Sequence, residues 1–150
     1  MSIMWSYLDK EKATIQVLED YSSMVFNLNH AEERIQEIRD QMVGIGSPNM
    51  DGLPKALNPK AGEEKIVNEM EKIDTLKEKH RQAEEYMTWF DPAWKELSDD
   101  EQYVLDAFFI SGDKNAANRC IDHFGIERNS VYRKRKRALA HLTLLLYGKE

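Results

Sequence analysis

The sequence predicts an all-α protein in which a long, coiled-coil-like antiparallel helical hairpin precedes a C-terminal helix-turn-helix domain. Three observations indicate this fold. Charged residues make up 32% of the 150 residues, whereas Gly and Pro number only 7 and 4, a composition that favours helix. Apolar residues recur every three or four positions over two long stretches. Basic residues gather in one helical segment near the C-terminus.

The charges of the chain are divided unevenly along its length. Residues 1–127 hold 14 Lys or Arg against 26 Asp or Glu, a net charge of −12, whereas residues 128–150 hold 7 against 1, a net charge of +6. The total of −6 therefore hides a basic end. Such a division concentrates attraction to phosphate at that end, and the acidic remainder discourages non-specific wrapping along DNA.

The first helix is expected from about Trp5 to Met42, a stretch without Gly or Pro. Its apolar residues recur at spacings of three, four and seven, as on one face of an amphipathic helix. These residues are Leu8, Ile15, Leu18, Val25, Leu28, Ile35, Ile38 and Met42. Most of the Gly and Pro residues of the chain then fall between Gly44 and Gly62, which predicts a flexible loop over about 44–62.

A second helix is expected from about Glu63 to Phe90, and it carries two apolar rows. The first row has heptad spacing and the second lies beside it. The rows are Ile66, Ile73, His80 and Met87, and Leu76, Ala83 and Phe90. Two such stripes can bury each other within one chain as an antiparallel hairpin, although pairing between two chains would satisfy the same stripes. Residues 1–90 are therefore assigned to oligomerisation or partner contact, with a homodimer through these N-terminal helices as an open alternative.

Residues 91–150 are assigned to the helix-turn-helix domain. Asp91-Pro92 is typical of a helix cap followed by a proline in the first turn, and is expected to begin a short element. Ser98 and Glu101 have the spacing of a capping box, which predicts a helix from there to about Ile110. The apolar face of that helix comprises Leu97, Val104, Leu105, Phe108 and Phe109.

Two further helices joined by a short turn are expected to follow. The first ends at Gly125, because glycine readily adopts the left-handed conformation at a helix C-terminus. The second runs from about 128 to 147 and includes the basic run 133–137. Their inner residues are Ala116, Ala117, Cys120, Ile121 and Phe124, and Val131, Ala138, Leu139, Leu142 and Leu145. Such a pair, joined through a Gly-containing turn and with a basic second helix, is typical of proteins that read the major groove of DNA.

These segments also resemble a known family. Residues 97–105 (LSDDEQYVL), residues 124–133 (FGIERNSVYR) and residues 137–139 (RAL) look like region 4 of the primary bacterial sigma factors. The layout of a helical N-terminal half, a Gly/Pro loop and a sigma-like C-terminal domain is similar to the ArpU-type phage and prophage transcriptional regulators. The resemblance implies a sequence-specific regulator of phage or prophage late genes that binds double-stranded DNA and recruits host RNA polymerase.

Carried over position by position, the resemblance implies two groups of DNA contacts. Residues at base-contacting positions are Arg128, Asn129, Tyr132 and Arg133; the expected phosphate contacts are Ser130, Lys134, Lys136, Arg137 and His141. A bidentate contact of Arg to guanine, or of Asn to adenine, is worth about 1 to 3 kcal/mol of discrimination. Glu127 stands where the family has a Ser or Thr cap, which leaves two alternatives: Asn129 reads a base, or the helix starts later and Asn129 caps it.

Other classes of function lack support in the sequence. The single cysteine, Cys120, excludes an intramolecular disulfide and a multi-cysteine zinc site; it is expected in the core and suits a reducing, cytoplasmic compartment. No phosphate-binding Gly loop, nucleophile motif, metal-ligand spacing, signal peptide or membrane span is evident, so no enzyme activity, cofactor, metal or membrane contact is expected. Two alternatives remain, a phage DNA-packaging adaptor similar to a small terminase subunit, and a module that binds RNA polymerase without contacting DNA.

Overall fold

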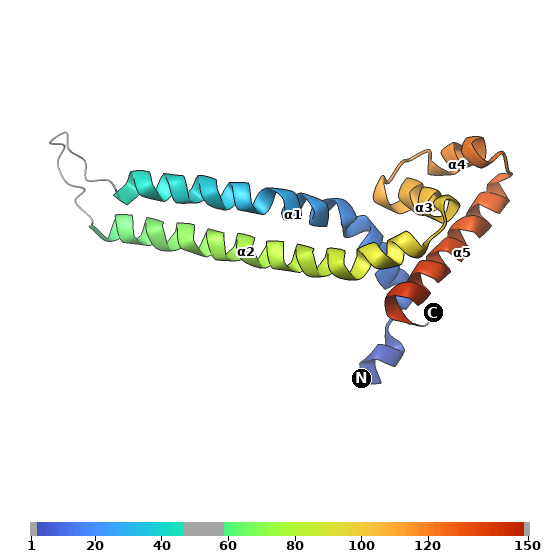
Figure 1. Cartoon of the computed structure of the whole chain (residues 1–150), viewed down its shortest axis with the longest axis horizontal. Coiled ribbons are helices and arrows are strands. Elements are labelled where there is room, and N and C mark those ends of the chain that lie inside the picture. The colour runs from blue at the N-terminus through green and yellow to red at the C-terminus, as the bar shows by residue number, and fades with distance from the viewer. Residues whose placement is uncertain (1–2, 47–58, 149–150) are drawn as a thin grey trace. The chain divides into compact units, whose positions relative to one another are not determined.

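The computed structural model describes residues 3–46 and 59–148, and every regular element within these ranges is helical (Figure 1). The elements are η1 (Ile3–Tyr7), a 3-10 helix, α1 (Lys10–Gly46), α2 (Pro59–Glu96), α3 (Asp99–Leu105), η2 (Asp106–Ile110), a π-helical turn, α4 (Ala116–Phe124) and α5 (Arg128–Tyr147). The prediction of an all-α protein is confirmed for the described residues.

Helix α1 begins at Lys10, later than expected, because Asp9 caps it. The Asp9 carboxylate accepts a hydrogen bond from the backbone N–H of Lys12 at 3.0 Å, as Asp commonly does before a helix. Trp5 lies in η1 instead, and Leu8, expected on the buried row, is exposed. The predicted start of the first helix near Trp5 is therefore wrong.

Both long helices extend into the stretch predicted as a loop. Helix α1 continues to Gly46 and α2 begins at Pro59, so the predicted loop over 44–62 is wrong at both of its ends. Proline suits the first turn of a helix, because its φ is already helical and its missing N–H would have no partner there. Residues 47–58, the remainder of the predicted loop, lie outside the described residues.

Helix α2 also continues through Pro92, where the sequence predicted a new element. A proline within a helix costs about 3 kcal/mol, since one backbone hydrogen bond is lost. Phe90 and Ala93 lie in α2 on either side of the proline, Leu97 follows directly after the helix ends at Glu96, and all three are buried. Burial stabilises by about 1.5 to 3 kcal/mol for each large apolar side chain, which offsets the cost. The prediction that Asp91-Pro92 begins an element is wrong for this reason.

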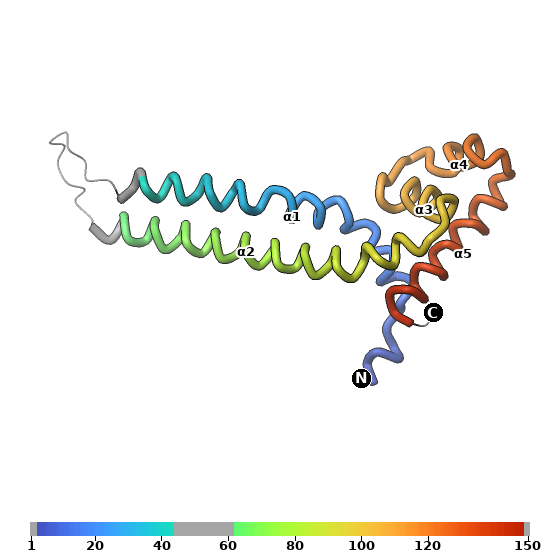
Figure 2. Tube along the Cα trace, viewed as in Figure 1, coloured from blue at the N-terminus to red at the C-terminus, as the bar shows by residue number. Residues whose placement is uncertain are grey.

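The described helices divide into two compact units. The middle unit, Val25–Glu84, holds parts of α1 and α2, which lie side by side (Figure 2). Its buried cluster consists of Ile35 and Ile38 from α1 and Ile73 from α2, with two partly buried residues, Met42 and Leu76, packed against them. All five belong to the apolar rows predicted from the sequence.

The terminal unit comprises Met1–Met24 together with Glu85–Glu150. Its largest fully buried apolar side chains come from α1 to α5: Leu18, Phe90, Val104, Leu105, Cys120, Val131 and Leu142. Polar contacts support this core. The hydroxyl of Thr143 in α5 lies 2.9 Å from that of Thr14 in α1, both buried, and the Tyr86 hydroxyl of α2 donates to the Val17 carbonyl of α1. The first turns of α1 thus share a core with α5.

The predicted capping box at the start of α3 is confirmed. The backbone N–H of Glu101 donates to the Ser98 hydroxyl at 3.2 Å, and the backbone N–H of Ser98 donates to the Glu101 carboxylate at 3.0 Å. The helix reaches Ile110 as expected, but its last residues form the π-helical turn η2, which the sequence did not reveal.

One residue of the predicted inner row of α5 faces outward. Leu145 is exposed, and Thr143 and Leu146 are buried in its place. Trp89 of α2 lies against this end of α5, because its indole N–H donates to the Leu146 carbonyl at 3.3 Å. The contact with α1 and α2 therefore turns the buried face of α5 toward 143 and 146, and the prediction of Leu145 as a core residue is wrong.

Candidate nucleic-acid interface

A three-residue turn joins α4 to α5. Gly125 ends α4 with φ 65° and ψ 38°, the left-handed conformation, and its N–H donates to the Ile121 carbonyl at 2.8 Å. Ile126 packs against the core, and Glu127 is the N-cap of α5 without a side-chain capping bond. Helix α5 starts at Arg128, so Asn129 is its second residue and is not its cap. Of the two alternatives, the late start with Asn129 as cap is excluded.

The buried face of α5 determines which of its side chains face outward. Val131, Ala138 and Leu142 are fully buried against the terminal unit, at spacings of seven and four. Because an α-helix has 3.6 residues per turn, positions opposite this row are directed away from the core. The outward side chains in the first half of α5 are Asn129, Ser130, Arg133, Lys136 and Arg137.

Three cations share this outward face. Arg133, Lys136 and Arg137 are exposed and, with Ser130, line one shallow hollow of the surface. The Arg133 side chain lies along the helix, where its Nε donates to the Asn129 carbonyl at 3.4 Å. Among the described residues, none of the three cations forms an ion pair. This face therefore presents positive charge that no ion pair with a described residue neutralises.

The other predicted base-contacting residues lie differently. Arg128 donates to the Asn118 side-chain oxygen at 2.7 Å, and this contact joins the start of α5 to α4. Tyr132 is 37% exposed and contacts Phe108, with ring centroids 6.0 Å apart. The structure therefore brings Asn129 and Arg133 together on the outward face, and places Arg128 and Tyr132 at its borders.

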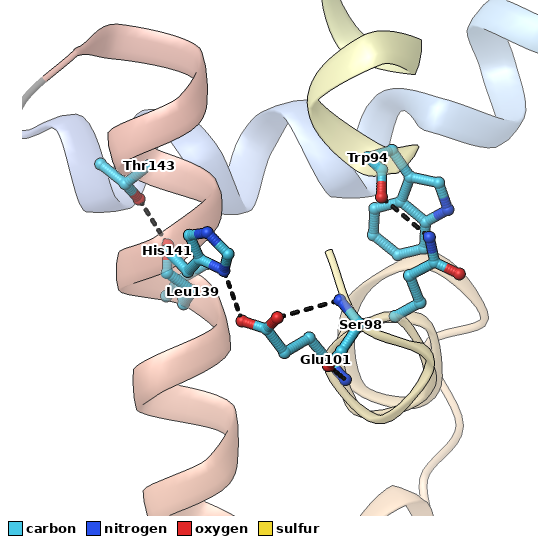
Figure 3. Close-up of polar contacts among 7 residues, drawn as sticks. Trp94, Ser98, Glu101, Leu139, His141 and Thr143 are labelled. Atoms are coloured by element: carbon cyan, nitrogen blue, oxygen red, sulfur yellow. Dashed lines mark hydrogen bonds and ion pairs between the residues drawn. The ribbon is translucent and has the colours of Figure 1, made fainter. Parts of the chain in front are cut away.

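Two of the predicted phosphate contacts are directed toward α3. The Lys134 ammonium lies 4.9 Å from the ring centroid of Phe124 and 3.7 Å from the Asp100 carboxylate. The His141 ring nitrogen lies 2.7 Å from the Glu101 carboxylate (Figure 3). Both side chains are partly buried in these contacts, unlike those of Lys136 and Arg137.

Glu101 is the centre of a small polar network between α3 and α5 (Figure 3). One carboxylate oxygen caps the Ser98 amide and the other contacts His141. Burial opposes ionisation of Glu101, but the hydrogen bonds from Ser98 and His141 outweigh it, so the pKa of Glu101 lies below its ordinary value. The network fixes the position of α5 relative to α3 through the charged form of one carboxylate.

Sequence reasoning missed two contacts that shape this surface. The Arg135 guanidinium lies over two rings, 4.7 Å from the centroid of Phe108 and 4.9 Å from that of Tyr132. The helical period could have revealed this, since Arg135 is four residues after buried Val131. The bond between Asn118 and Arg128 has no comparable signal in the sequence.

Other kinds of site find little support in the described ranges. Cys120 is buried as expected, and burial raises the pKa of its thiol. The described residues contain no cluster of His, Cys, Asp or Glu suited to a metal ion. No helix within 3–46 or 59–148 combines the length and apolar character needed to cross a bilayer. Comparison of the chain with protein families, with curated proteins and with solved structures finds no match.

Proposed function

We propose that this chain is a sequence-specific DNA-binding regulator of phage or prophage late transcription, similar to the ArpU-type regulators. In this proposal α4, the turn and α5 form a helix-turn-helix that resembles sigma region 4, and α5 reads the major groove. The observation that carries the proposal is the outward face of α5. Arg133, Lys136 and Arg137 share that face and form no ion pair within the described part of the chain, while the opposite face is buried.

The proposed roles follow from position along the helix. The N-terminal part of a recognition helix contacts base edges, and cations further along neutralise phosphates. Asn129 and Arg133 are the proposed base readers at the centre, with Arg128 and Tyr132 at the border. Ser130, Lys136 and Arg137 are proposed to contact phosphate; Lys134 and His141 would do so only by leaving their partners on α3.

The long helices serve a second part of the proposal. We take α1 and α2 as an antiparallel, coiled-coil-like hairpin whose free surface contacts host RNA polymerase. The buried isoleucines of the middle unit support helix pairing within one chain. A cytoplasmic location belongs to the same proposal, because DNA and polymerase are there and the lone cysteine requires no oxidising compartment.

The division of roles on α5 can be tested by DNA binding. A preferred site is first selected from a pool of random-sequence duplexes, and affinity for it and for a scrambled duplex is measured at several salt concentrations. Arg133→Ala is expected to lose about 10- to 100-fold on the selected site and little on the scrambled one. Lys136→Ala is expected to weaken binding to the two duplexes equally. It should also reduce the slope of log affinity against log salt concentration by about 0.9.

A matched control is Lys77→Ala, which removes an exposed cation from α2 in the middle unit and should change neither affinity. Equal losses for Arg133→Ala and Lys136→Ala on all duplexes would contradict the assignment of base and phosphate contacts. Absence of any salt-dependent DNA binding at low ionic strength would contradict DNA binding itself, and would favour a module that binds protein.

A further inference from the structure

The first described element, η1, exposes an unusual amount of apolar surface. Ile3, Met4 and Tyr7 are 74%, 70% and 82% exposed, and Leu8 just after the helix is 54% exposed. The element is held to the terminal unit through Trp5, whose ring centroid lies 5.5 Å from that of Tyr147 in α5. Ile3, Met4 and Tyr7 are therefore mostly exposed although the element is attached.

Neighbouring residues of α2 and α5 extend this apolar surface. Tyr147 also contacts Trp89, with ring centroids 5.5 Å apart, so the two tryptophans meet at the same tyrosine. Trp89 is 40% exposed, and Leu144, one helical turn before Tyr147, is 47% exposed. We call this the aromatic surface; its exposed members are Ile3, Met4, Tyr7, Leu8, Trp89 and Leu144.

The area of the aromatic surface matches that of one side of a protein interface. The six exposed fractions are fractions of whole residues and together equal between three and four residues, which at about 200 Å² each gives roughly 700 Å² with the backbone included. The largest apolar patch on a typical monomer is about 300 to 600 Å². A stable interface buries about 800 Å² on each partner, so a surface of this size is large enough to hold one.

The charge distribution indicates which partner fits. Residues 1–8 and 142–148, which supply five of the six members, contain no charged side chain. A two-fold interface brings a patch against its own copy, and an uncharged patch does so without like-charge repulsion. Charges of both signs follow directly at 9–12 (DKEK), with Lys10 5.7 Å from the Trp5 ring, as in the polar rim of an interface.

We infer that the aromatic surface is the contact through which two copies of this chain form a dimer. The inference does not depend on DNA binding, and it names a different surface from the apolar rows of α1 and α2. If α5 does read DNA, the contact would join two copies of the unit that carries it, and a dimer reads two half-sites.

Sedimentation equilibrium of the full chain tests the inference. The wild-type chain is expected to be a dimer in the range of about 1 to 100 μM. Tyr7→Asp and Ile3→Asp introduce a charge at exposed positions and should weaken the dimer at least about tenfold, as desolvation of a charge requires. Circular dichroism should show unchanged helix content in both variants.

The matched control is Val67→Asp, the same kind of change at an exposed apolar residue of α2 in the middle unit, which should leave the dimer intact. Dissociation by Val67→Asp but not by Tyr7→Asp would overturn the inference in favour of pairing through the long helices. A wild-type chain that stays monomeric over the whole concentration range would also overturn the inference. The same holds if this monomer binds lipid vesicles through the aromatic surface.

Discussion

The basic run of α5 separates into different contacts because successive residues of a helix are rotated by about 100°. Arg133, Lys136 and Arg137 face outward and form no ion pair among the described residues. Lys134 is directed to Asp100, and Arg135 covers Phe108 and Tyr132. Of five neighbouring cations, three are therefore exposed without an ion pair among the described residues, and two contact other side chains of the same unit.

The single carboxylate of Glu101 makes two kinds of contact. Its carboxylate caps α3 and also contacts His141 on α5, so it contributes to a local element and to packing between elements. Burial raises the pKa of Glu101, but hydrogen bonds to the charged form lower it further, and the net pKa is below the ordinary value. Such a group stabilises the fold only while it is ionised.

The stability of the fold should depend on pH through Glu101. A carboxyl with a lower pKa in the folded chain stabilises the fold above its unfolded pKa, and the contribution disappears as pH falls through the folded value. Glu101→Gln should therefore be less stable than wild type near neutral pH, and the difference should shrink as pH falls below the ordinary pKa of 4.5. Urea unfolding at a series of pH values measures this difference in the free energy of unfolding.

The control is Glu32→Gln, at an exposed position of α1. A stability difference for Glu101→Gln that does not change with pH would contradict a stabilising role of the ionised Glu101 carboxylate.

At the scale of elements, α3 and α5 of the terminal unit start in different ways. Helix α3 has a complete capping box, whereas α5 begins at Glu127 with no side-chain cap. The start of α5 depends on the preceding turn, where Gly125 is left-handed and Ile126 is anchored in the core. The angle at which α5 leaves α4 should therefore depend on the left-handed conformation of Gly125.

Replacement of that glycine tests its role. Gly125→Ala should destabilise the fold by about 1 to 2 kcal/mol, because the left-handed conformation is unfavourable for a residue with a Cβ. An added Cβ would meet no atom within 4 Å, so the cost comes from the backbone alone. Gly62→Ala in α2 is the control, because a Cβ at Gly62 also meets no atom within 4 Å but the residue lies within a helix. This change should stabilise the fold by about 1 kcal/mol. Chemical denaturation measures both, and equal effects of the two changes would refute the explanation.

At the scale of the whole molecule, the terminal unit is assembled from segments far apart in the sequence. Leu18, Phe90 and Leu142 come from α1, α2 and α5 and belong to one buried cluster. The sequence pattern suggested a division at residue 91, whereas the compact units divide the chain near residues 24 and 85. The unit that carries α5 therefore includes the first turns of α1.

This assembly predicts an effect at long range. Leu18→Ala should destabilise the terminal unit by about 2 to 5 kcal/mol and reduce hydrogen-exchange protection of the α5 backbone amides, because Leu18 is fully buried in the cluster with Leu142. Ile73→Ala removes a comparable side chain from the core of the middle unit and is the control. Its effect should be confined to amides of that unit. Loss of α5 protection in Ile73→Ala, or its retention in Leu18→Ala, would contradict the division into units.

Much of the candidate interface could be predicted from residue type and helical period. The ends of α5, the left-handed Gly125 and the buried positions Val131, Ala138 and Leu142 follow from local rules of capping and amphipathicity. The partners of individual side chains could not be predicted. Arg128 binds Asn118 and His141 binds Glu101, and these pairs depend on how α5 crosses α4 and α3.

The sequence by itself determined that this protein is helical and that its positive charge is concentrated near the C-terminus, because helix propensity, apolar spacing and charge are local properties of the chain. Capping chemistry likewise determined where α3 begins. Only the tertiary structure decided that α2 continues through Pro92, that Leu145 faces solvent, and that α1 shares the core of α5. At Pro92, burial of the neighbouring side chains offsets a local cost of about 3 kcal/mol. In all three cases the outcome depends on a partner segment distant in sequence, about which local patterns carry no information.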